Sequence, residues 1–193
     1  MDVPPEMIRS AQSGDRQAME DLIKGSYRAA YTLALRLLGN PDDAAEATQE
    51  TYIRVVRGLK RLGEPDAFPT WLFKITSNVC ISEMRRRTRR DIPTENVAEH
   101  EASPVDVEAV VTGRVAAEEL EQLMRQLPEA YRTVIVLRDV YDMSGDEAAE
   151  ILGVTPGAVK VRLHRARRRL RDELVARFPE WASSEGPQEK VIA

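Results

Sequence analysis

The sequence predicts an all-α protein with two small helical domains, a bundle and a helix-turn-helix domain, joined by a flexible acidic linker. Apolar residues recur at steps of three and four through most of the chain, and no segment clearly keeps the two-residue period of a strand. Residues 91–108 (DIPTENVAEHEASPVDVE) instead hold prolines, many acids and few large apolar side chains, as linkers do. We therefore expect domains at residues 1–88 and 113–178, a linker at 89–112 and a disordered tail at 179–193.

Turn signals divide the first domain into helices. In chain order we expect two short helices separated at Gly14-Asp15, an amphipathic helix over residues 27–38, a helix from residue 42 to about Leu59, a loop over residues 65–69 and a helix capped by Thr70. In the second domain, periodicity returns at Val115, and Pro128 opens a further helix. The apolar run of residues 134–137 would suit a strand, but its helical surroundings favour a helix.

Residues 144–171 (SGDEAAEILGVTPGAVKVRLHRARRRLR) predict a short helix, a tight turn and a longer basic helix. Gly153 ends the first helix in the left-handed conformation, Thr155 caps the second, and Pro156 suits its first turn. At about 100° per residue, one stripe of the second helix gathers the apolar residues that pack on the first. This stripe consists of Val159, Leu163, Ala166 and Leu170.

The opposite face of the basic helix has small residues near its start and cations behind them. Its members are Gly157, Val161, His164, Arg165 and Arg168, with Lys160 on the flank. A helix of this kind enters a DNA major groove and holds phosphates. A solvated basic helix is the alternative, but the turn, the cap and the stripe together favour DNA binding.

The charge distribution also indicates nucleic acid and protein partners. The chain has 193 residues and a formal net charge of −4, which argues against a wholly non-specific nucleic-acid binder. Two basic clusters, at residues 85–90 and 160–171, are separated by an acidic stretch. This pattern predicts contact with DNA at two places and with protein elsewhere.

Several other classes of protein are not expected. No apolar run approaches the roughly 18 residues of a membrane span, and the N-terminus lacks a signal-peptide pattern, so we expect a cytoplasmic protein without membrane insertion. Cys80, His100 and His164 are too few for a zinc site, so no metal or cofactor is expected. Nucleotide-binding, metalloprotease and nucleophile-elbow motifs are missing from the sequence, which argues against an enzyme.

Two parts of the chain resemble bacterial RNA polymerase sigma factors of the extracytoplasmic-function class, group IV of the sigma-70 family. Residues 40–57 (NPDDAAEATQETYIRVVR) and 68–87 (FPTWLFKITSNVCISEMRRR) are similar to the second domain of these factors. Residues 123–170 are similar to their fourth domain. The resemblance implies an initiation factor that binds core polymerase, recognises promoter −10 and −35 elements and helps open the DNA. A stand-alone helix-turn-helix regulator is the alternative, although the first half shows no receiver-like alternation of strands and helices.

The resemblance assigns the first domain to polymerase binding. It implies that one face of the helix after Asp42 docks on the clamp helices of the β′ subunit, while the β flap contacts the factor elsewhere. The face consists of Asp43, Glu46, Gln49 and Glu50. We expect no Lys or Arg four residues after these acids to compensate their charge. Without the resemblance, such an acidic face would be interpreted as merely solvated. An anti-sigma partner between the domains is also common in the family.

The resemblance further implies that the first domain captures a base of the −10 element. The loop at residues 65–70 and Asn78 are expected to form the pocket, and the nearby residues expected to contact this DNA are Phe68, Trp71, Arg85, Arg86 and Arg87. The apolar members also suit a core role. Ser82 stands where the family usually has an acidic residue, with Glu83 beside it, which leaves the local salt bridges open.

In the second domain the resemblance implies recognition of the −35 element by the basic helix. The expected base-reading residues are Lys160, Val161, His164 and Arg165, and the expected phosphate contacts are Thr155 and Arg168. His164 is equally suited to packing, and other arginines of this helix either hold phosphates or face solvent. The acidic linker is either a flexible tether or a segment that enters positively charged polymerase channels.

Overall fold

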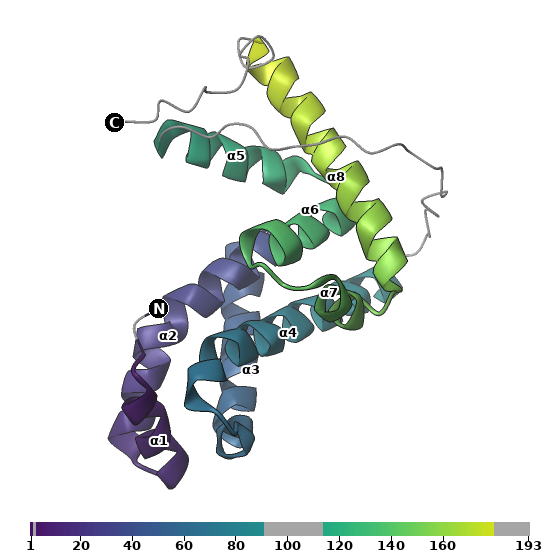
Figure 1. The fold of residues 1–193 in the computed structure, drawn as a ribbon. Coiled ribbons are helices and arrows are strands. Elements are labelled where there is room, and N and C mark those ends of the chain that lie inside the picture. Colours follow the sequence, from purple (N-terminus) through teal and green to yellow (C-terminus); the bar gives the residue numbers. More distant parts are fainter. Residues whose placement is uncertain (2, 91–113, 180–193) are drawn as a thin grey trace, which may run out of the picture. The chain divides into compact units, whose positions relative to one another are not determined.

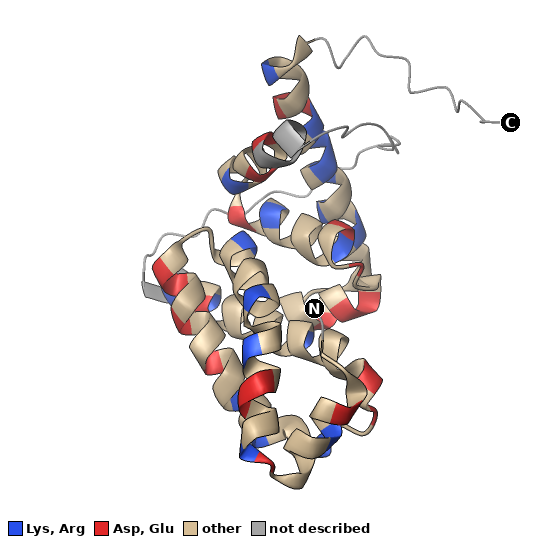
Figure 2. Cartoon of the chain, turned by 90° about the vertical axis from the view of Figure 1, so that its left-hand side faces the viewer, with Lys and Arg blue, Asp and Glu red and all other residues tan. Residues whose placement is uncertain are grey.

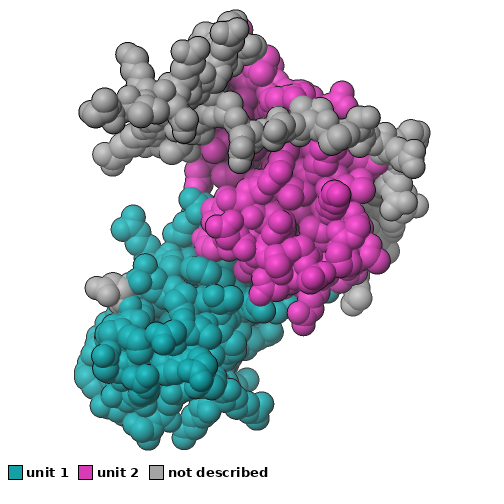
Figure 3. Space-filling view, in the orientation of Figure 1, with its two compact units in different colours: residues 1–96 teal, residues 97–193 magenta. Residues whose placement is uncertain are grey.

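The computed structural model describes residues 1, 3–90 and 114–179, and every regular element in these ranges is a helix (Figure 1). Because these ranges contain no strand, the all-α prediction is confirmed. The chain divides into two compact units, residues 1–96 and 97–193, which have different colours in Figure 3. Nearly all of the predicted linker and tail lies outside the described residues.

Unit 1 is a helical bundle. Its elements are α1 (Pro5–Ser13), α2 (Arg16–Leu38), α3 (Pro41–Gly58), the 3-10 turns η1 (Leu59–Arg61) and η2 (Pro65–Ala67), and α4 (Phe68–Arg90). Helices α2, α3 and α4 each pack on the other two, and α1 packs on α2 and on both 3-10 turns. The core between them includes side chains with no exposed area, among them Leu22, Leu33, Val55, Phe68 and Leu72.

Local side-chain chemistry explains where these helices begin and end. The Asp15 carboxylate accepts a hydrogen bond from the Ala18 amide at 3.1 Å and so caps α2. Gly39 ends α2 in the left-handed conformation, with φ 74°. The Asn40 side chain then accepts hydrogen bonds from the next two free amides and starts α3. These caps fix the turn between the two helices.

Two sequence-based boundaries in unit 1 are wrong. Residues 16–38 form one helix and not two, because no proline interrupts them and Gly25 costs only about 1 kcal/mol in a helix interior. Ala30, Ala34 and Leu38 of this helix are buried, whereas Tyr27 is 42% exposed. Thr70 is not an N-cap, since η2 leads directly into α4 at Phe68.

Unit 2 consists of α5 (Arg114–Gln126), α6 (Glu129–Ile135), the π-helical turn η3 (Val136–Val140), α7 (Gly145–Leu152) and α8 (Pro156–Arg177). Residues 134–137 are helical, as expected. Helices α5, α6 and α7 all pack on α8. The buried core of this unit includes Leu123, Val134, Leu137, Ile151 and Val159.

The predicted helix-turn-helix is confirmed in α7 and α8. Ser144 and Glu147 form a reciprocal capping box at the start of α7, and Gly153 ends it with φ 64°. The Thr155 hydroxyl accepts the Ala158 amide at 3.2 Å and caps α8. The predicted stripe of α8 faces the core, where Val159, Leu163 and Ala166 are buried and Leu170 is half-buried.

Candidate nucleic-acid and protein interfaces

The acidic residues of α3 lie together on the edge of a shallow groove between α3 and α4. Asp43, Glu46, Gln49 and Glu50 line this groove, and Glu83 and Arg86 of α4 line its other side. Glu46 and Gln49 are exposed, and Asp43 and Glu50 are half-buried. All four residues expected to bind polymerase therefore share one accessible surface, which we call the acidic groove.

Cations beside the acidic groove form ion pairs with its carboxylates. Arg54 lies four residues after Glu50 and pairs with it at 2.8 Å, so the expectation of an uncompensated face is wrong. Arg87 reaches from α4 to Asp43 at 2.5 Å and also contacts Glu83 at 3.4 Å. The side chains in these pairs remain partly exposed, which keeps each pair weak and accessible to a competing partner.

Glu83 resolves the question raised by the unusual Ser82. The Glu83 carboxylate accepts hydrogen bonds from Arg86 at 2.9 Å and from Arg87 at 3.4 Å. These hydrogen bonds, Arg86 first, lower the pKa of Glu83, and they raise the pKa of Arg86 in turn. The Ser82 hydroxyl only donates to the Asn78 carbonyl one turn earlier. Glu83 thus supplies the carboxylate at this end of α4.

An apolar groove that the sequence analysis missed lies next to the acidic one. It runs between α2 and α3 and is lined by Ile23, Tyr27, Gln49, Tyr52, Ile53, Val56 and Arg57. Ile53 and Val56 are 45% and 48% exposed, and the rings of Tyr27 and Tyr52 stack at 6.1 Å. The spacing of Ile53 and Val56, one turn apart and off the buried face of α3, is the sequence signal that would have revealed this surface.

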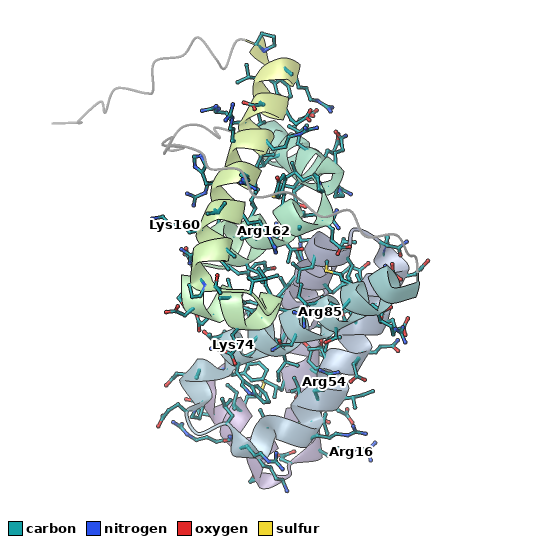
Figure 4. The ribbon with its side chains drawn as sticks, turned by 90° about the vertical axis from the view of Figure 1, so that its right-hand side faces the viewer. Arg16, Arg54, Lys74, Arg85, Lys160 and Arg162 are labelled. Atoms are coloured by element: carbon teal, nitrogen blue, oxygen red, sulfur yellow. The ribbon has the colours of Figure 1, made fainter. Side chains whose placement is uncertain are left out.

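The residues expected to contact −10 DNA fall into different environments. Phe68 has no exposed area and belongs to the core, so this structure does not offer it to DNA, and its assignment as a DNA contact is corrected. Trp71 is half-buried against Phe68, with ring centroids 6.2 Å apart. Asn78, later on the same helix, is exposed. Arg85 is exposed on the same helix (Figure 4).

The outer face of α8 carries the residues expected to read −35 DNA. Thr155, Lys160 and Val161 are exposed, with Val161 at 46%, while His164 and Arg165 are half-buried. Lys160 and Arg162, labelled in Figure 4, differ by about 200° around the helix and therefore project in different directions. Within the described part of the chain, neither forms an ion pair.

The cations in the second half of α8 have carboxylate partners (Figure 2 shows the charges along the helix). Arg167, expected to hold phosphate or face solvent, makes two hydrogen bonds to Asp139 of η3, at 2.6 and 3.0 Å. Asp139 thereby raises the pKa of Arg167. Further pairs join Arg168 to Asp172 at 4.0 Å, Arg169 to Glu173 at 2.9 Å and Arg177 to Glu119 at 2.8 Å.

The described residues contain no cluster of three or more metal-ligating side chains. Cys80 is buried, and burial raises the pKa of its thiol to about 12, so the thiolate is disfavoured. Among the residues described, no helix is both long and apolar enough to cross a membrane. The candidate sites are the acidic groove with its apolar neighbour, the part of α4 that carries Asn78 and Arg85, and the outer face of α8.

Both units match models of sigma-70 transcription factors. Residues 22–90 match sigma-70 region 2, and residues 117–170 match sigma-70 region 4. The ECF RNA polymerase sigma factor SigE of Mycolicibacterium smegmatis is 34% identical over 89% of this chain and 68% of its own length. SigW of Bacillus subtilis, also an ECF RNA polymerase sigma factor, is 32% identical over 86% of this chain and 94% of its own.

Two solved structures are also similar to this chain. CnrH in complex with the cytosolic domain of CnrY has a TM-score of 0.55 and 26% identity, covering 91% of this chain and 99% of that one. The Bartonella quintana sigma factor RpoE, in complex with the anti-sigma factor NepR, has a TM-score of 0.54 and 25% identity, covering 80% and 95%.

A region 2 bundle followed by a region 4 helix-turn-helix defines a sigma factor, a non-enzymatic protein that binds RNA polymerase and directs it to promoters. The chain belongs to the ECF family of RNA polymerase sigma factors. The region 2 match accounts for the first half of the chain, so a stand-alone helix-turn-helix regulator is not favoured.

Proposed function

We propose that the two units divide the work of this transcription initiation factor. Residues 1–88 bind core polymerase and capture the −10 element, residues 113–178 read the −35 element, and residues 89–112 connect them. The observation that carries this proposal is the separation of the two candidate surfaces: the acidic groove belongs to unit 1 and the basic outer face of α8 to unit 2. Each unit also has its own buried core.

In this proposal the acidic groove docks on the β′ clamp helices. Asp43, Glu46, Gln49 and Glu50 supply carboxylates and an amide on one accessible edge, suited to a basic partner. Glu50→Arg and Gln49→Arg should each abolish holoenzyme formation in a pull-down with core polymerase. Glu20→Arg is the matched control, because Glu20 is an exposed acid of α2 that pairs only locally with Arg16. Normal co-purification of both groove variants, with circular dichroism unchanged, would refute the docking site.

The promoter-opening role rests on α4 and the turn before it. Asn78 and residues 65–70 form the base pocket with Trp71 on its wall, and Arg85 holds the strand's phosphates. Arg86 and Arg87 join Arg85 by exchanging Glu83 and Asp43 for phosphate. Permanganate reactivity of promoter thymines should fall in Asn78→Ala holoenzyme without loss of core binding. Equal permanganate reactivity in wild-type and Asn78→Ala holoenzyme would show that Asn78 is not part of the base pocket.

The −35 role rests on α8. Lys160, Val161, His164 and Arg165 read bases, while Thr155 and Arg168 contact phosphates; Val161 suits a thymine methyl group. Replacing Lys160 or Arg165 by alanine should relax sequence choice in footprinting. Replacing Arg168 should weaken binding to all sequences and lessen its dependence on salt. The division fails if all three variants behave alike.

We further propose that the factor works in the bacterial cytoplasm under control of an anti-sigma factor. Two structural relatives support this partner, since one is held by the cytosolic domain of CnrY and the other by the anti-sigma factor NepR. Run-off transcription with core polymerase and a pool of genomic fragments tests the whole proposal and yields the promoters. Absence of initiation from every fragment, with no inhibitor present, would contradict it.

A further inference from the structure

Helix α1 precedes the segment that matches sigma-70 region 2, yet it is built into the core of unit 1. The match begins at residue 22, whereas α1 covers Pro5–Ser13. Ile8 and Ala11 are 1% and 2% exposed and belong to the same core cluster as Leu59 and Phe68. Because η1 and η2 both pack on α1, this helix supports the two ends of the chain between α3 and α4.

Gln12 makes the polar part of this contact. Its side-chain amide nitrogen donates hydrogen bonds to the Leu59 carbonyl at 3.0 Å and to the Leu62 carbonyl at 2.6 Å. Both carbonyls lie where the helical backbone of α3 and η1 ends. The Leu59 carbonyl also accepts the Leu62 amide at 3.1 Å, so Gln12 uses its second lone pair. The half-buried Gln12 thereby connects α1 to the segment that follows α3. Its two contacts cross 47 and 50 residues of sequence.

The chain immediately after Leu62 has little other support. A Cβ placed on Gly63 would meet no heavy atom within 4 Å, and Glu64 is exposed. Structure resumes when the Ala67 amide donates to the Glu64 carbonyl at 3.0 Å and Pro65 becomes buried. The position of residues 63–67 is therefore set from two sides: η2 at one end and the Gln12 contact at the other.

We propose that Gln12 is a positioning residue for promoter opening: it holds the turn between η1 and α4 in the shape that receives an extruded −10 base. This inference rests on the proposed function, in which residues 65–70 belong to the base pocket. Gln12 does not itself touch DNA. It acts by removing alternative positions of the turn before the base arrives, which lowers the ordering cost of capture.

Two variants remove the hydrogen bonds in different ways. Gln12→Met keeps the length and volume of the side chain but has no donor, and Gln12→Glu stays polar but places a carboxylate against two carbonyl oxygens. Gln17→Met is the matched control, since Gln17 is exposed on α2 and its amide donates only to Asp21, at 3.1 Å. Circular dichroism identifies any variant that fails to fold, and the other variant is then used for the test.

The decisive measurement compares a base with an abasic site. Holoenzyme binds forked promoter DNA from a promoter recovered by run-off transcription, with single abasic sites placed through the −10 element. Wild-type holoenzyme and Gln17→Met should bind one position much more weakly when its base is missing. In Gln12→Met and Gln12→Glu holoenzyme, the ratio of affinities for intact and abasic DNA should fall about tenfold, while core polymerase is bound normally. This magnitude corresponds to the loss of two neutral hydrogen bonds.

The outcomes separate the two ideas. If wild-type holoenzyme binds every abasic template as well as intact DNA, the base pocket of the proposed function fails, and the role of Gln12 with it. If wild-type holoenzyme discriminates and both Gln12 variants discriminate equally well, the pocket stands and the inference about Gln12 is overturned. A fall in core-polymerase affinity matching the loss of discrimination would also overturn it, because Gln12 would then support the fold of unit 1 in general.

Discussion

The contact between Arg167 and Asp139 gives the sharpest prediction about unit 2. The guanidinium group of Arg167 makes a two-point contact with the carboxylate, which ties α8 to η3 across 28 residues of sequence. Exposed ion pairs contribute roughly 0.2–1 kcal/mol, and two-point geometry raises a pair within that range. Because the Arg167 and Asp139 side chains are 44% and 28% exposed, we expect a coupling energy of about 1 kcal/mol.

A double-mutant cycle measures this coupling. Arg167→Met, Asp139→Asn and the double variant are compared with the wild type by hydrogen exchange of the α8 backbone amides, which reports the stability of unit 2 separately from unit 1. The single variants should each lose protection, and the double variant should lose less than their sum. The coupling should shrink at about 1 M salt, where charges are screened within about 3 Å.

Arg168→Met is the neighbouring control. Arg168 faces solvent, 61% exposed, and its distance to Asp172 is 4.0 Å, so its replacement should hardly change exchange in α8 but should weaken DNA binding. Arg167→Met should show the opposite pattern. Additive exchange effects in the cycle, or a larger DNA defect for Arg167→Met than for Arg168→Met, would refute the structural role of Arg167.

Three further predictions concern caps and titrating groups. Thr155→Ala removes the cap of α8 and should destabilise unit 2 by about 1 kcal/mol, measured by hydrogen exchange; an unchanged α8 would contradict the cap. Burial raises the pKa of Tyr52 to about 12, so its neutral form stabilises unit 1 fully below pH 10 and this contribution is lost as the pH rises toward 12. Absorbance titration should show a late tyrosine that Tyr52→Phe abolishes, and its persistence in that variant would contradict the assignment. The pKa of Glu83 is lowered by Arg86, so the stabilisation it provides is complete above its ordinary pKa of 4.5 and disappears as the pH falls through the lower folded value. Unfolding curves of Glu83→Gln and wild type should therefore differ at neutral pH and converge in acid, and a constant difference would count against it.

The helix-turn-helix was predictable in detail because its rules are local. Gly153, Thr155 and Pro156 lie within four residues of one another, and each acts through its own backbone conformation or a cap three residues away. The apolar stripe of α8 follows from a fixed rotation per residue, and its members are buried as expected. The all-α fold class needed only the same periodicity applied along the chain.

The ion pairs between different helices were not predictable in this way. Arg87 pairs with Asp43, and Arg167 with Asp139, across 44 and 28 residues, so their partners depend on how the helices pack. The sequence therefore indicated arginines for DNA where the structure uses some of them to join helices. Tyr27 shows the related problem within one helix: several faces of α2 are apolar, and only packing selects which one is buried.

The environment of Trp71 gives the protein a built-in optical reporter. The indole is half-buried beside Phe68, and it packs so closely on α3 that a Cβ on Gly58 would lie 3.1 Å from its Cζ2 atom. Trp71 and Trp181 are the two tryptophans of the sequence, so Trp181→Phe leaves a single fluorophore. In the isolated factor, its emission wavelength and quenching would follow any displacement of α4 against α3 without an attached dye.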